Sequence, residues 1–337
     1  MPIDRPAQGS DYCGGMLAAY AVSQSSSDPL SGLVIGQRPD PVARPKWSVV
    51  KLRAAGLNHH DVWSLRGVGL PAERLPMILG CDGAGVDEAG NEVIVHAVVP
   101  SDGWVGDETL DPARTLLSEL YDGTLAEYVA VPSRNCVPKP AGLSFEAAAC
   151  LSTAWLTAYR MLFVNAGLTP GATVLVQGAG GGVSSAVIQM GSAAGYRVWA
   201  TSRDEGKRAR ALEIGADKAF SSGERLPERV DAVLEAVGAA TWSHSINSLK
   251  PGGTVVISGA TSGDAPAKAE LTKIFFKQLR VVGSTMGTRS ELERLASFIV
   301  NQGISPVIDS TFALADARQG FEKMATGDVF GKVVFTL

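Results

Sequence analysis

The pattern of apolar and polar positions divides the chain into two textures. Up to about residue 138, short apolar runs are cut by Gly, Pro and Asp, as at residues 48–53, 92–99 and 125–132. The last of these runs alternates apolar and polar residues, which is the pattern of a half-buried strand. Only residues 58–65 indicate a helix in this part. The pattern therefore predicts a β-rich domain.

After residue 140 the pattern changes to an alternation of strands and helices. A long helix is expected over residues 144–163, with Ser144 as its N-cap. The elements expected next are strands at residues 173–177, 196–201, 231–235, 254–258 and 279–283, helices at 183–194, 205–214, 241–249 and 290–302, and a turn at 250–253. This alternation predicts βαβ units in a parallel sheet with helices on both faces.

The length and composition fit two domains. The 337 residues are 45% hydrophobic and 19% charged, which is a globular composition. We expect an α/β protein in which a β-rich domain, residues 16–140 and 303–337, flanks a doubly wound parallel-sheet domain, residues 141–302. Residues 1–15 are polar and without periodicity, so we expect them to form a flexible leader.

Charge and cysteine content narrow the expected partners. With 30 basic and 34 acidic residues the formal charge is −4, and no Lys/Arg cluster suggests a nucleic-acid surface. No stretch approaches the ~20 apolar residues that span a bilayer. The four cysteines form no CxxC pair, which favours reduced thiols over disulfides or structural zinc. We expect a cytoplasmic protein that binds a small molecule, and neither nucleic acid nor a membrane.

The strongest chemical signal is a glycine-rich segment, residues 178–184, between a predicted strand and a predicted helix. Glycines there let a dinucleotide pyrophosphate approach the backbone, and the helix N-terminus offers N–H donors and a positive dipole. The spacing departs from G-x-G-x-x-G, because Ala179 takes the first glycine position and Ser184 the last. The predicted contacts are Ala179, Gly180, Gly181, Gly182 and Val183.

The end of the next predicted strand indicates which dinucleotide binds. NAD sites place an acidic residue ~20 residues beyond the glycines. This chain has Ser202 and Arg203 there, with Lys207 one turn further. Hydroxyl, guanidinium and ammonium groups bind a 2′-phosphate, whereas cations are otherwise disfavoured at a helix start. The alternative is a solvated helix start. We predict NADP(H), bound by these three residues.

Several segments resemble the medium-chain dehydrogenase/reductases over nearly the whole chain after about Gly15. They are residues 51–67, 79–86, 122–132, 147–162, 178–185, 275–288 and 331–334. The resemblance implies a GroES-like catalytic domain, a Rossmann cofactor domain, a cleft between them for nicotinamide and substrate, and a homodimer paired through the edge of the cofactor-domain sheet. It also implies cofactor contacts from Thr157, Gly259, Ser284, Thr285, Met286 and Lys332.

The same resemblance allows the zinc ligands of the family to be compared with the residues of this chain. Zinc-dependent members carry ligands where this chain has Asn58, Cys81 and Thr153, and only the Cys81 thiol is a good zinc ligand. Residues 100–123, which hold structural zinc in some members, contain no cysteine. The two histidines that follow Asn58 are adjacent, so their side chains diverge and rarely chelate together. We therefore predict that no metal is bound.

Without a Lewis acid, oxidation of a simple alcohol is hard, whereas an electron-poor acceptor can still be reduced. A quinone or an α,β-unsaturated carbonyl compound takes hydride from NADPH and delocalises the charge, so the protein supplies position and a hydrogen bond. Asn58 is the candidate hydrogen-bond donor, and His59 and His60 are candidates for proton relay. Asp61 is expected to tie down the backbone. Each also fits a plain structural role as turn, cap or exposed residue.

Two other functions remain open from the sequence. One is a zinc-type alcohol dehydrogenase with atypical ligands, for which the Cys81 thiol is the starting point. The other is an NADPH-binding protein of low turnover with a regulatory or RNA-binding role. The leading prediction is a zinc-independent, NADPH-dependent reductase of quinones or activated alkenes.

Overall fold

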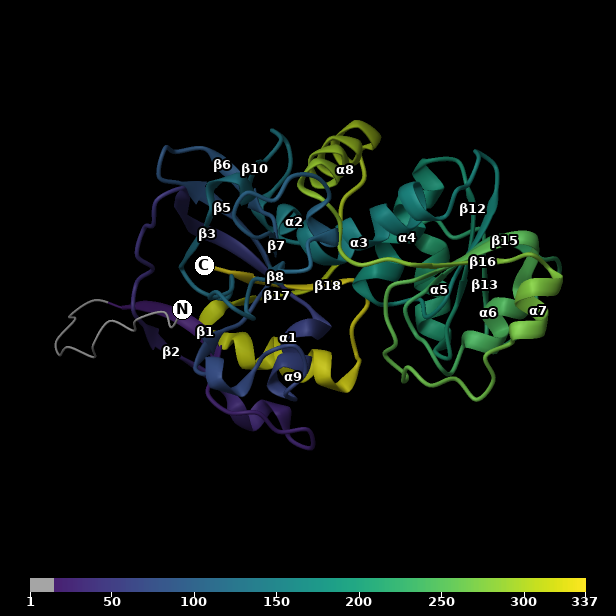
Figure 1. The fold of residues 1–337 in the computed structure, drawn as a ribbon, viewed down its shortest axis with the longest axis horizontal. Helices are drawn as coiled ribbons and strands as arrows, with labels where there is room; N and C mark the ends of the chain where they lie inside the picture. Colours follow the sequence, from purple (N-terminus) through teal and green to yellow (C-terminus); the bar gives the residue numbers. More distant parts are fainter. Residues whose placement is uncertain (1–14) are drawn as a thin grey trace.

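Two lobes make up the computed structural model, which describes residues 15–337 (Figure 1). The leader predicted for residues 1–15 lies outside the described residues, except for Gly15. One lobe carries mainly antiparallel sheets and the other a single parallel sheet. Antiparallel strands are joined by short turns and parallel strands by helical crossovers, which is why the two textures of the sequence become two lobes. The fold is the expected α/β class.

The β-rich lobe contains a three-stranded sheet ordered β2-β1-β4, a seven-stranded sheet ordered β10-β6-β5-β3-β18-β17 with β9 also paired to β3, and the pair β7-β8. Its strands are β1 (Met16–Ala21), β2 (Leu33–Arg38), β3 (Trp47–Leu57), β4 (Met77–Ile78), β5 (Asp82–Asp87), β6 (Glu92–Val95), β7 (Val98–Val99), β8 (Thr115–Leu116), β9 (Tyr128–Pro132), β10 (Cys136–Pro138), β17 (Ile308–Ala313) and β18 (Lys332–Thr336). Its helices are α1 (His59–Leu65) and α9 (Ala317–Thr326).

The C-terminal strand β18 lies inside the sheet built by the N-terminal part. It runs antiparallel to β3, with Val333 opposite Leu57 and Thr336 opposite Ala54. Figure 1 shows this yellow segment among the purple and blue strands. Every residue from Lys332 to Phe335 is buried, because β18 is a central strand with Val334 in one core cluster and Val333 and Phe335 in another. The pairing brings Lys332 beside the end of β3.

The second lobe is a six-stranded parallel sheet ordered β13-β12-β11-β14-β15-β16. Its strands are β11 (Thr173–Val176), β12 (Arg197–Thr201), β13 (Lys218–Phe220), β14 (Val230–Glu235), β15 (Leu249–Ile257) and β16 (Arg280–Gly283). Its helices are α4 (Gly182–Ala193), α5 (Glu205–Glu213), α6 (Trp242–Ser248) and α7 (Leu271–Phe276), while α8 (Arg289–Gln302) follows β16 and lies nearer the β-rich lobe (Figure 1).

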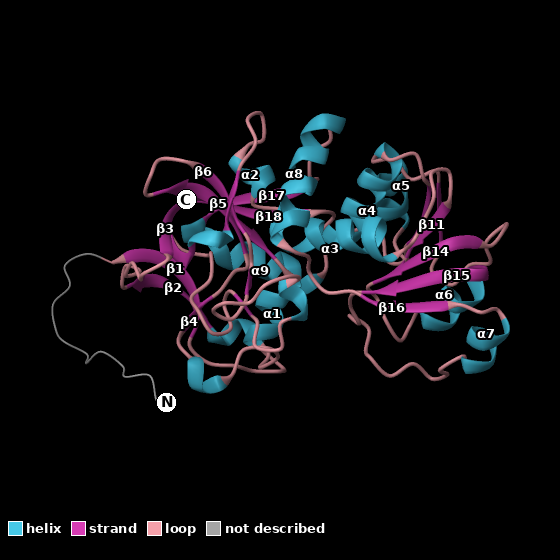
Figure 2. Cartoon of the chain, turned by 45° about the horizontal axis from the view of Figure 1, so that its top comes forward, coloured by secondary structure: helices cyan, strands magenta, loops and turns pink. Residues whose placement is uncertain are grey.

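Helices cover both faces of the parallel sheet, because alternate side chains of β11 pack against different helices. Val174 and Val176 pack in one core cluster together with Ala186 of α4, whereas Leu175 packs in another with Ile246 of α6. Figure 2 shows α4 and α5 on one side of the strands and α6 on the other. The order reverses at β11, where β12 lies to one side and β14 to the other. In such sheets ligands bind at this reversal, beyond the carboxyl ends of the strands.

The helix expected over residues 144–163 is interrupted. Ser144 does cap its start, accepting a hydrogen bond from the Ala147 N–H at 3.1 Å. The helical path then consists of α2 (Phe145–Ala148), a π-helical segment, α3 (Leu156–Tyr159) and a second π-helical segment that ends at Asn165. π-Helical turns accommodate extra residues and often mark functional regions. Here the first one carries Ser152, whose hydroxyl donates to the Val95 carbonyl across the lobe boundary.

Three other sequence expectations differ from the structure. The predicted turn at residues 250–253 is absorbed into β15, with a register irregularity opposite β14, because Gly252 bends the strand at a φ of 76°. The apolar run at residues 92–99 is divided into β6 and β7. The short elements β13 and α7 were not expected, since neither shows a clear period. Within residues 15–337, no helix combines the length and apolar character needed to cross a membrane.

Candidate functional site

The end of β3 and the start of α1 form one side of the candidate site. Asn58 is the N-cap of α1, and its backbone N–H donates to Asp61 Oδ2 at 2.8 Å. The other carboxyl oxygen of Asp61 accepts the Gly80 N–H at 2.8 Å. Asp61 is buried, and burial raises the pKa of its carboxyl despite these donors. Asp61 therefore holds two chain segments together, in keeping with the role expected from the sequence.

Lys332 crosses from β18 to this corner. Its buried ammonium donates to the Leu57 carbonyl at 2.9 Å, to Asn58 Oδ1 at 2.6 Å and to Asp82 Oδ2 at 2.8 Å. The amide nitrogen of Asn58 donates to the same Asp82 oxygen at 2.9 Å. Three acceptors match the three ammonium protons. Both ends of the Asn58 amide are therefore occupied, and the ammonium predicted to contact the cofactor is committed to this network.

The two adjacent histidines face different surroundings. His60 Nε2 lies 3.1 Å from Glu119 Oε1, and His60 Nδ1 lies 3.5 Å from Cys81 Sγ. His59 keeps an exposed surface, and partial burial together with the charges of Lys332, Arg66 and Lys207 lowers the pKa of its imidazole. A cationic neighbourhood disfavours a second cation. The divergence expected for adjacent histidines is present, and the two rings are not interchangeable.

The glycine-rich turn leads directly into α4. Gly181 is its N-cap, and Gly178 and Gly180 have φ angles of 76° and 121°, which only glycine adopts without strain. Within the described chain, the N–H groups of Gly181, Gly182 and Val183 have no acceptor outside the helix itself, and the first turn of a helix offers none. These free donors form the cradle that an anion requires.

Close contacts surround the turn. A Cβ on Gly182 would meet Lys332 Cδ at 2.9 Å and Ala154 Cβ at 3.1 Å. The Gly180 carbonyl accepts the Gly331 N–H at 2.9 Å, so the turn is fixed to the chain just before β18. Ser184, at the last glycine position, donates its hydroxyl to the Gly178 carbonyl at 2.8 Å. Serine therefore fits this position with its polar group satisfied.

The side chains predicted to bind a 2′-phosphate lie at the carboxyl end of β12. Ser202 is buried, and Arg203 is exposed at the start of the following loop. Lys207 lies across the glycine turn and donates to the Gly327 carbonyl at 2.7 Å. Asp204, which the sequence argument did not weigh, caps α5 by accepting the Lys207 N–H at 2.7 Å. Its carboxylate is therefore oriented toward its own helix.

The loop that follows β16 connects the two lobes. The Ser284 N–H donates to the Ile257 carbonyl at 2.8 Å, and the Ser284 hydroxyl accepts from the Asn165 amide at 2.9 Å. Met286 has a left-handed φ of 49° and packs against Cys81 and its neighbours. Of the other residues implied by the resemblance, Thr157 is buried in α3, Gly259 follows the end of β15, and Thr285 lies beside Ser284 in this loop.

The donor set does not suit a catalytic metal. Among residues 15–337, the one group of metal-ligating side chains that gathers within 4.8 Å is His60, Asp61 and Cys81. Both Asp61 oxygens already accept backbone N–H groups, and the Asn58 oxygen accepts from the Lys332 ammonium. A zinc site needs three good ligands converging on one point. Asp61 would have to share its oxygens between the ion and two backbone N–H groups, so these residues fit the ion poorly.

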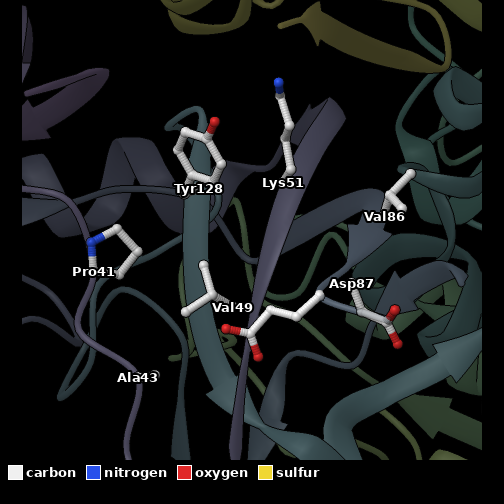
Figure 3. A pocket seen from close by; sticks show the side chains of 8 residues that line it. Pro41, Ala43, Val49, Lys51, Val86, Asp87 and Tyr128 are labelled. Atoms are coloured by element: carbon white, nitrogen blue, oxygen red, sulfur yellow. The ribbon is translucent and has the colours of Figure 1, made fainter. Parts of the chain in front are cut away.

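A hollow of about 370 Å³ lies elsewhere, on the β-rich lobe, and Figure 3 shows its lining. Tyr128 and Lys51 point the same way from neighbouring strands, with the Lys51 ammonium 5.8 Å from the ring centre, and Asp87 follows at the edge. None of these residues belongs to the His60 cluster or to the glycine turn. Neither a convergent polar group nor a nucleophile lines it, so we assign it no chemistry.

Each of the two lobes resembles known proteins. A family model described as an alcohol dehydrogenase GroES-like domain matches residues 44–141, and one described as a zinc-binding dehydrogenase matches residues 182–301. The zinc-type alcohol dehydrogenase-like protein YogA of Leptosphaeria maculans is 30% identical over 88% of this chain and 92% of its own length. The acryloyl-coenzyme A reductase of Sulfurisphaera tokodaii is 27% identical over 91% of this chain and 97% of its own length.

A solved structure adds to this picture. The crystal structure of an NAD-dependent alcohol dehydrogenase superposes with a TM-score of 0.88 at 34% identity, covering 96% of this chain and 100% of that one. The similarity therefore runs through both lobes and the connections between them.

Proposed function

The chain is an oxidoreductase of the medium-chain dehydrogenase/reductase superfamily, and from this membership we propose that it is a metal-independent, NADPH-dependent reductase of quinones or α,β-unsaturated carbonyl compounds. The observation that carries the proposal is the donor set at the end of β3. Lys332 and backbone N–H groups occupy the oxygens of Asn58 and Asp61, which leaves Cys81 and His60 without a third ligand. Without a metal to stabilise the negative charge formed by hydride addition, the acceptor itself must delocalise that charge.

The cofactor site is proposed at the glycine turn. The free N–H groups of Gly181, Gly182 and Val183 would hold the pyrophosphate, at the point where the strand order reverses. Among the described residues Arg203 has no ion-pair partner and would pair with a 2′-phosphate, while Lys207 lies across the glycine turn. A reduced nicotinamide, when bound, supplies a hydride. The residues predicted beside it, Thr157, Gly259, Ser284, Thr285 and Met286, remain candidates for that contact.

The acceptor class follows from what the cleft can stabilise. An alkene conjugated to a carbonyl, or a quinone, spreads the added negative charge onto oxygen, so hydrogen bonds and positioning suffice. The relative that acts on acryloyl-coenzyme A, an α,β-unsaturated thioester, is consistent with this class of acceptor. The Lys332 ammonium supplies positive charge on this side of the site. Of the four catalytic candidates from the sequence, we propose a structural role for Asn58 and Asp61, and His59 and His60 stay the candidates for proton transfer.

The test is a substrate and cofactor panel on the purified full-length chain. Oxidation of NADPH and of NADH is followed against 1,4-benzoquinone, 2-cyclohexen-1-one, hexanal and buffer, with and without EDTA. We expect turnover of the first two with NADPH and no effect of the chelator. Metal-dependent reduction of the aldehyde would support the zinc-type alcohol dehydrogenase instead. Tight NADPH binding without turnover would support the low-turnover binding protein, and preference for NADH would match the cofactor of the superposed dehydrogenase.

We also propose a homodimer formed through the edge of the parallel sheet. β16 pairs with β15 alone among the described strands, so its other edge is open. Beside it, α7 exposes Leu271, Phe275 and Phe276 at 70%, 66% and 80% of their surfaces. An open strand edge next to exposed aromatic side chains is a natural pairing surface. Light scattering on a size-exclusion column gives the mass directly, and Phe276→Glu is expected to yield monomer.

The proposed location is the cytoplasm.

A further inference from the structure

We propose that a buried chain of hydrogen bonds, which ends at the Glu235 carboxylate, holds the glycine turn in the shape that binds the dinucleotide. The inference rests on the proposed cofactor site and names three residues that position it from beneath. These residues, Glu235, Gln177 and Thr201, were not among the cofactor contacts expected from the sequence. They act through the backbone of the turn and are positioning residues.

The three residues lie where three neighbouring strands of the parallel sheet end. Gln177 directly follows β11, while Thr201 and Glu235 are the last residues of β12 and β14. β11 lies between β12 and β14, so the three side chains meet at one place on the edge of the sheet. Gln177 and Glu235 are 1% exposed, and Thr201 is fully buried. Polar side chains are buried at a cost unless each finds a hydrogen-bond partner, and here all three do.

Glu235 is the acceptor at which the chain ends. Its Oε1 accepts the N–H groups of Val237 and Gly238 at 2.8 and 3.0 Å. The Thr241 hydroxyl lies 2.9 and 2.8 Å from Oε1 and Oε2, and the Ser245 hydroxyl donates to Oε2 at 2.5 Å. Four donor groups therefore surround one carboxylate, which only accepts. The single hydroxyl proton of Ser245 is committed to Glu235.

The proton of Ser245 sets the direction of the bonds that follow. Because this hydroxyl donates to Glu235, it accepts from Gln177 Nε2, which lies 3.0 Å away. The amide oxygen of Gln177 then faces Thr201, whose hydroxyl donates to it at 2.6 Å. With its proton used, Thr201 Oγ1 accepts the Gly178 N–H at 3.3 Å. The bonds run in one sense from the glycine turn to the carboxylate, and bonds aligned in this way strengthen one another.

His244 gives an independent check on the orientation of the Gln177 amide. His244 Nε2 lies 2.9 Å from the Glu224 carbonyl, which only accepts, so this nitrogen carries a proton. The other nitrogen of a neutral ring is an acceptor, and it lies 2.9 Å from Gln177 Nε2. Both neighbours of the amide nitrogen therefore accept, and the same orientation follows from each.

Thr201 also ties the end of β12 to the glycine turn. Besides the contact of its hydroxyl with Gly178, its carbonyl accepts the Ala179 N–H at 2.6 Å. Ser202 and Arg203, which are proposed to bind the 2′-phosphate, follow Thr201 directly. Thr201 thereby sets the separation between the proposed pyrophosphate contacts and the proposed phosphate contacts.

The carboxylate fixes a second loop that presses on the turn. Gly178 has no room for a Cβ, which would meet Val237 Cγ2 at 2.6 Å. Glu235 holds the N–H of Val237, whose carbonyl accepts the Ser262 N–H at 2.7 Å. Ser262 lies in the loop after β15, which also contains the predicted cofactor contact Gly259. One carboxylate therefore anchors the glycine turn and the loops after β14 and β15.

The test is a fluorescence titration of NADPH and of NADH with a matched pair of variants at Thr201. Thr201→Val keeps the shape of the side chain without its hydroxyl, whereas Thr201→Ser keeps the hydroxyl. We expect Thr201→Val to weaken both cofactors about tenfold, because they share the turn, and Thr201→Ser to bind within about twofold of wild type. Thr173→Val, a buried threonine at the opposite end of β11, is the control and should bind as wild type.

Two results would overturn the proposal. One is equal affinity of Thr201→Val and Thr201→Ser, since the hydroxyl would then have no role. The other is a loss confined to NADPH, since the effect would then lie at Arg203 and not at the turn. In turnover of 2-cyclohexen-1-one, Thr201→Val should raise KM for NADPH about tenfold while kcat changes less than about twofold.

A second measurement tests whether the chain acts as a unit. In Glu235→Gln an amide nitrogen can donate to Ser245, so the direction of the bonds is no longer fixed. We expect the Gly178 amide proton, followed by NMR without cofactor, to exchange faster with solvent in this variant. The losses of NADPH affinity in Glu235→Gln and Thr201→Val should be less than additive when combined. Unchanged exchange, or additive losses, would contradict a connected chain. If Glu235→Gln does not fold, the Thr201 pair decides alone.

Failure of this inference and failure of the proposed function are distinguishable. If the wild-type chain binds NADPH and both Thr201 variants bind equally well, the hydrogen-bond chain has no positioning role and the proposed function stands. If the wild-type chain binds NADPH but reduces neither a quinone nor an enone, the proposed function falls, while the titrations still decide this inference. If the wild-type chain binds neither NADPH nor NADH, both fall.

Discussion

The two sides of the candidate site are built in opposite ways. On the parallel-sheet side, one continuous segment supplies the site through its backbone, as the free N–H groups of Gly181, Gly182 and Val183 show. On the β-rich side, side chains from separate segments meet, with His60 in contact with Cys81 on one side and with Glu119 on the other. A backbone site depends on local conformation, whereas a side-chain cluster depends on how remote strands pair. The first is therefore readable in a sequence and the second is not.

The largest effect is expected from breaking the side-chain cluster at Lys332. Its buried ammonium neutralises Asp82, so Lys332→Met leaves an unpaired buried carboxylate. Loss of one partner of a buried pair costs about 3–5 kcal/mol of the free energy of unfolding. Urea unfolding measures it. Lys332→Met combined with Asp82→Asn should recover part of the loss, and equal stability of the single and double variants would contradict the pairing.

The next largest effect is expected at the glycine turn that leads into α4. In Gly182→Val, the new side chain would press on Lys332 Cδ at 2.9 Å and on Ala154, and the lysine cannot swing away because its ammonium is held at three points. The turn must shift, so we expect NADPH affinity to fall about 100-fold, or about 2.7 kcal/mol. Fluorescence titration of NADPH measures it. Unchanged affinity in a folded variant would show that the cofactor lies elsewhere.

A smaller effect separates the two nicotinamide cofactors. Arg203→Gln removes the exposed cation proposed to pair with the 2′-phosphate. We expect NADPH affinity to fall about tenfold, or about 1.4 kcal/mol, with NADH affinity unchanged, because only the phosphate is lost as a partner. Arg197→Gln, whose guanidinium pairs with Glu228 at the other end of β12, is the control. A parallel loss for both cofactors would argue against phosphate recognition.

The smallest expected effect is the dependence of stability on pH. The pKa of His60 is raised in the folded chain, so its stabilising contribution is fully present below the unfolded pKa and is lost as pH rises through the folded pKa. The stability advantage of wild type over His60→Asn should therefore be larger in mildly acidic than in alkaline solution. Urea unfolding across that range checks the sign. An advantage that grows toward alkaline pH would mean a neutral ring.

Much of the fold was predictable because its signals are local. The pattern around β11 and α4 indicated a strand, a glycine turn and a helix within one short stretch, and the structure has them in that order. The N-cap roles of Ser144 and Asn58 follow from residue type as well. The interruption of the helix after Ala148 was not predicted, because π-helical turns leave no distinct period.

The contacts within the β-rich part of the candidate site could not be predicted from the sequence. The sequence suggested both histidines equally, and considered Cys81 only as a possible zinc ligand. Glu119 carries no motif, since a glutamate in a turn is ordinary. Only the pairing of β3 with β5, and the turn after β8, place Glu119 and Cys81 on opposite edges of one ring.

By itself, the sequence determined the two-lobed plan and the glycine turn between β11 and α4, because each depends on residue type and short-range spacing. The tertiary structure alone decided which histidine carries charge and where Lys332 ends. Those outcomes depend on side chains far apart in the chain meeting at distances of about 3 Å, where direct contact outweighs any local preference.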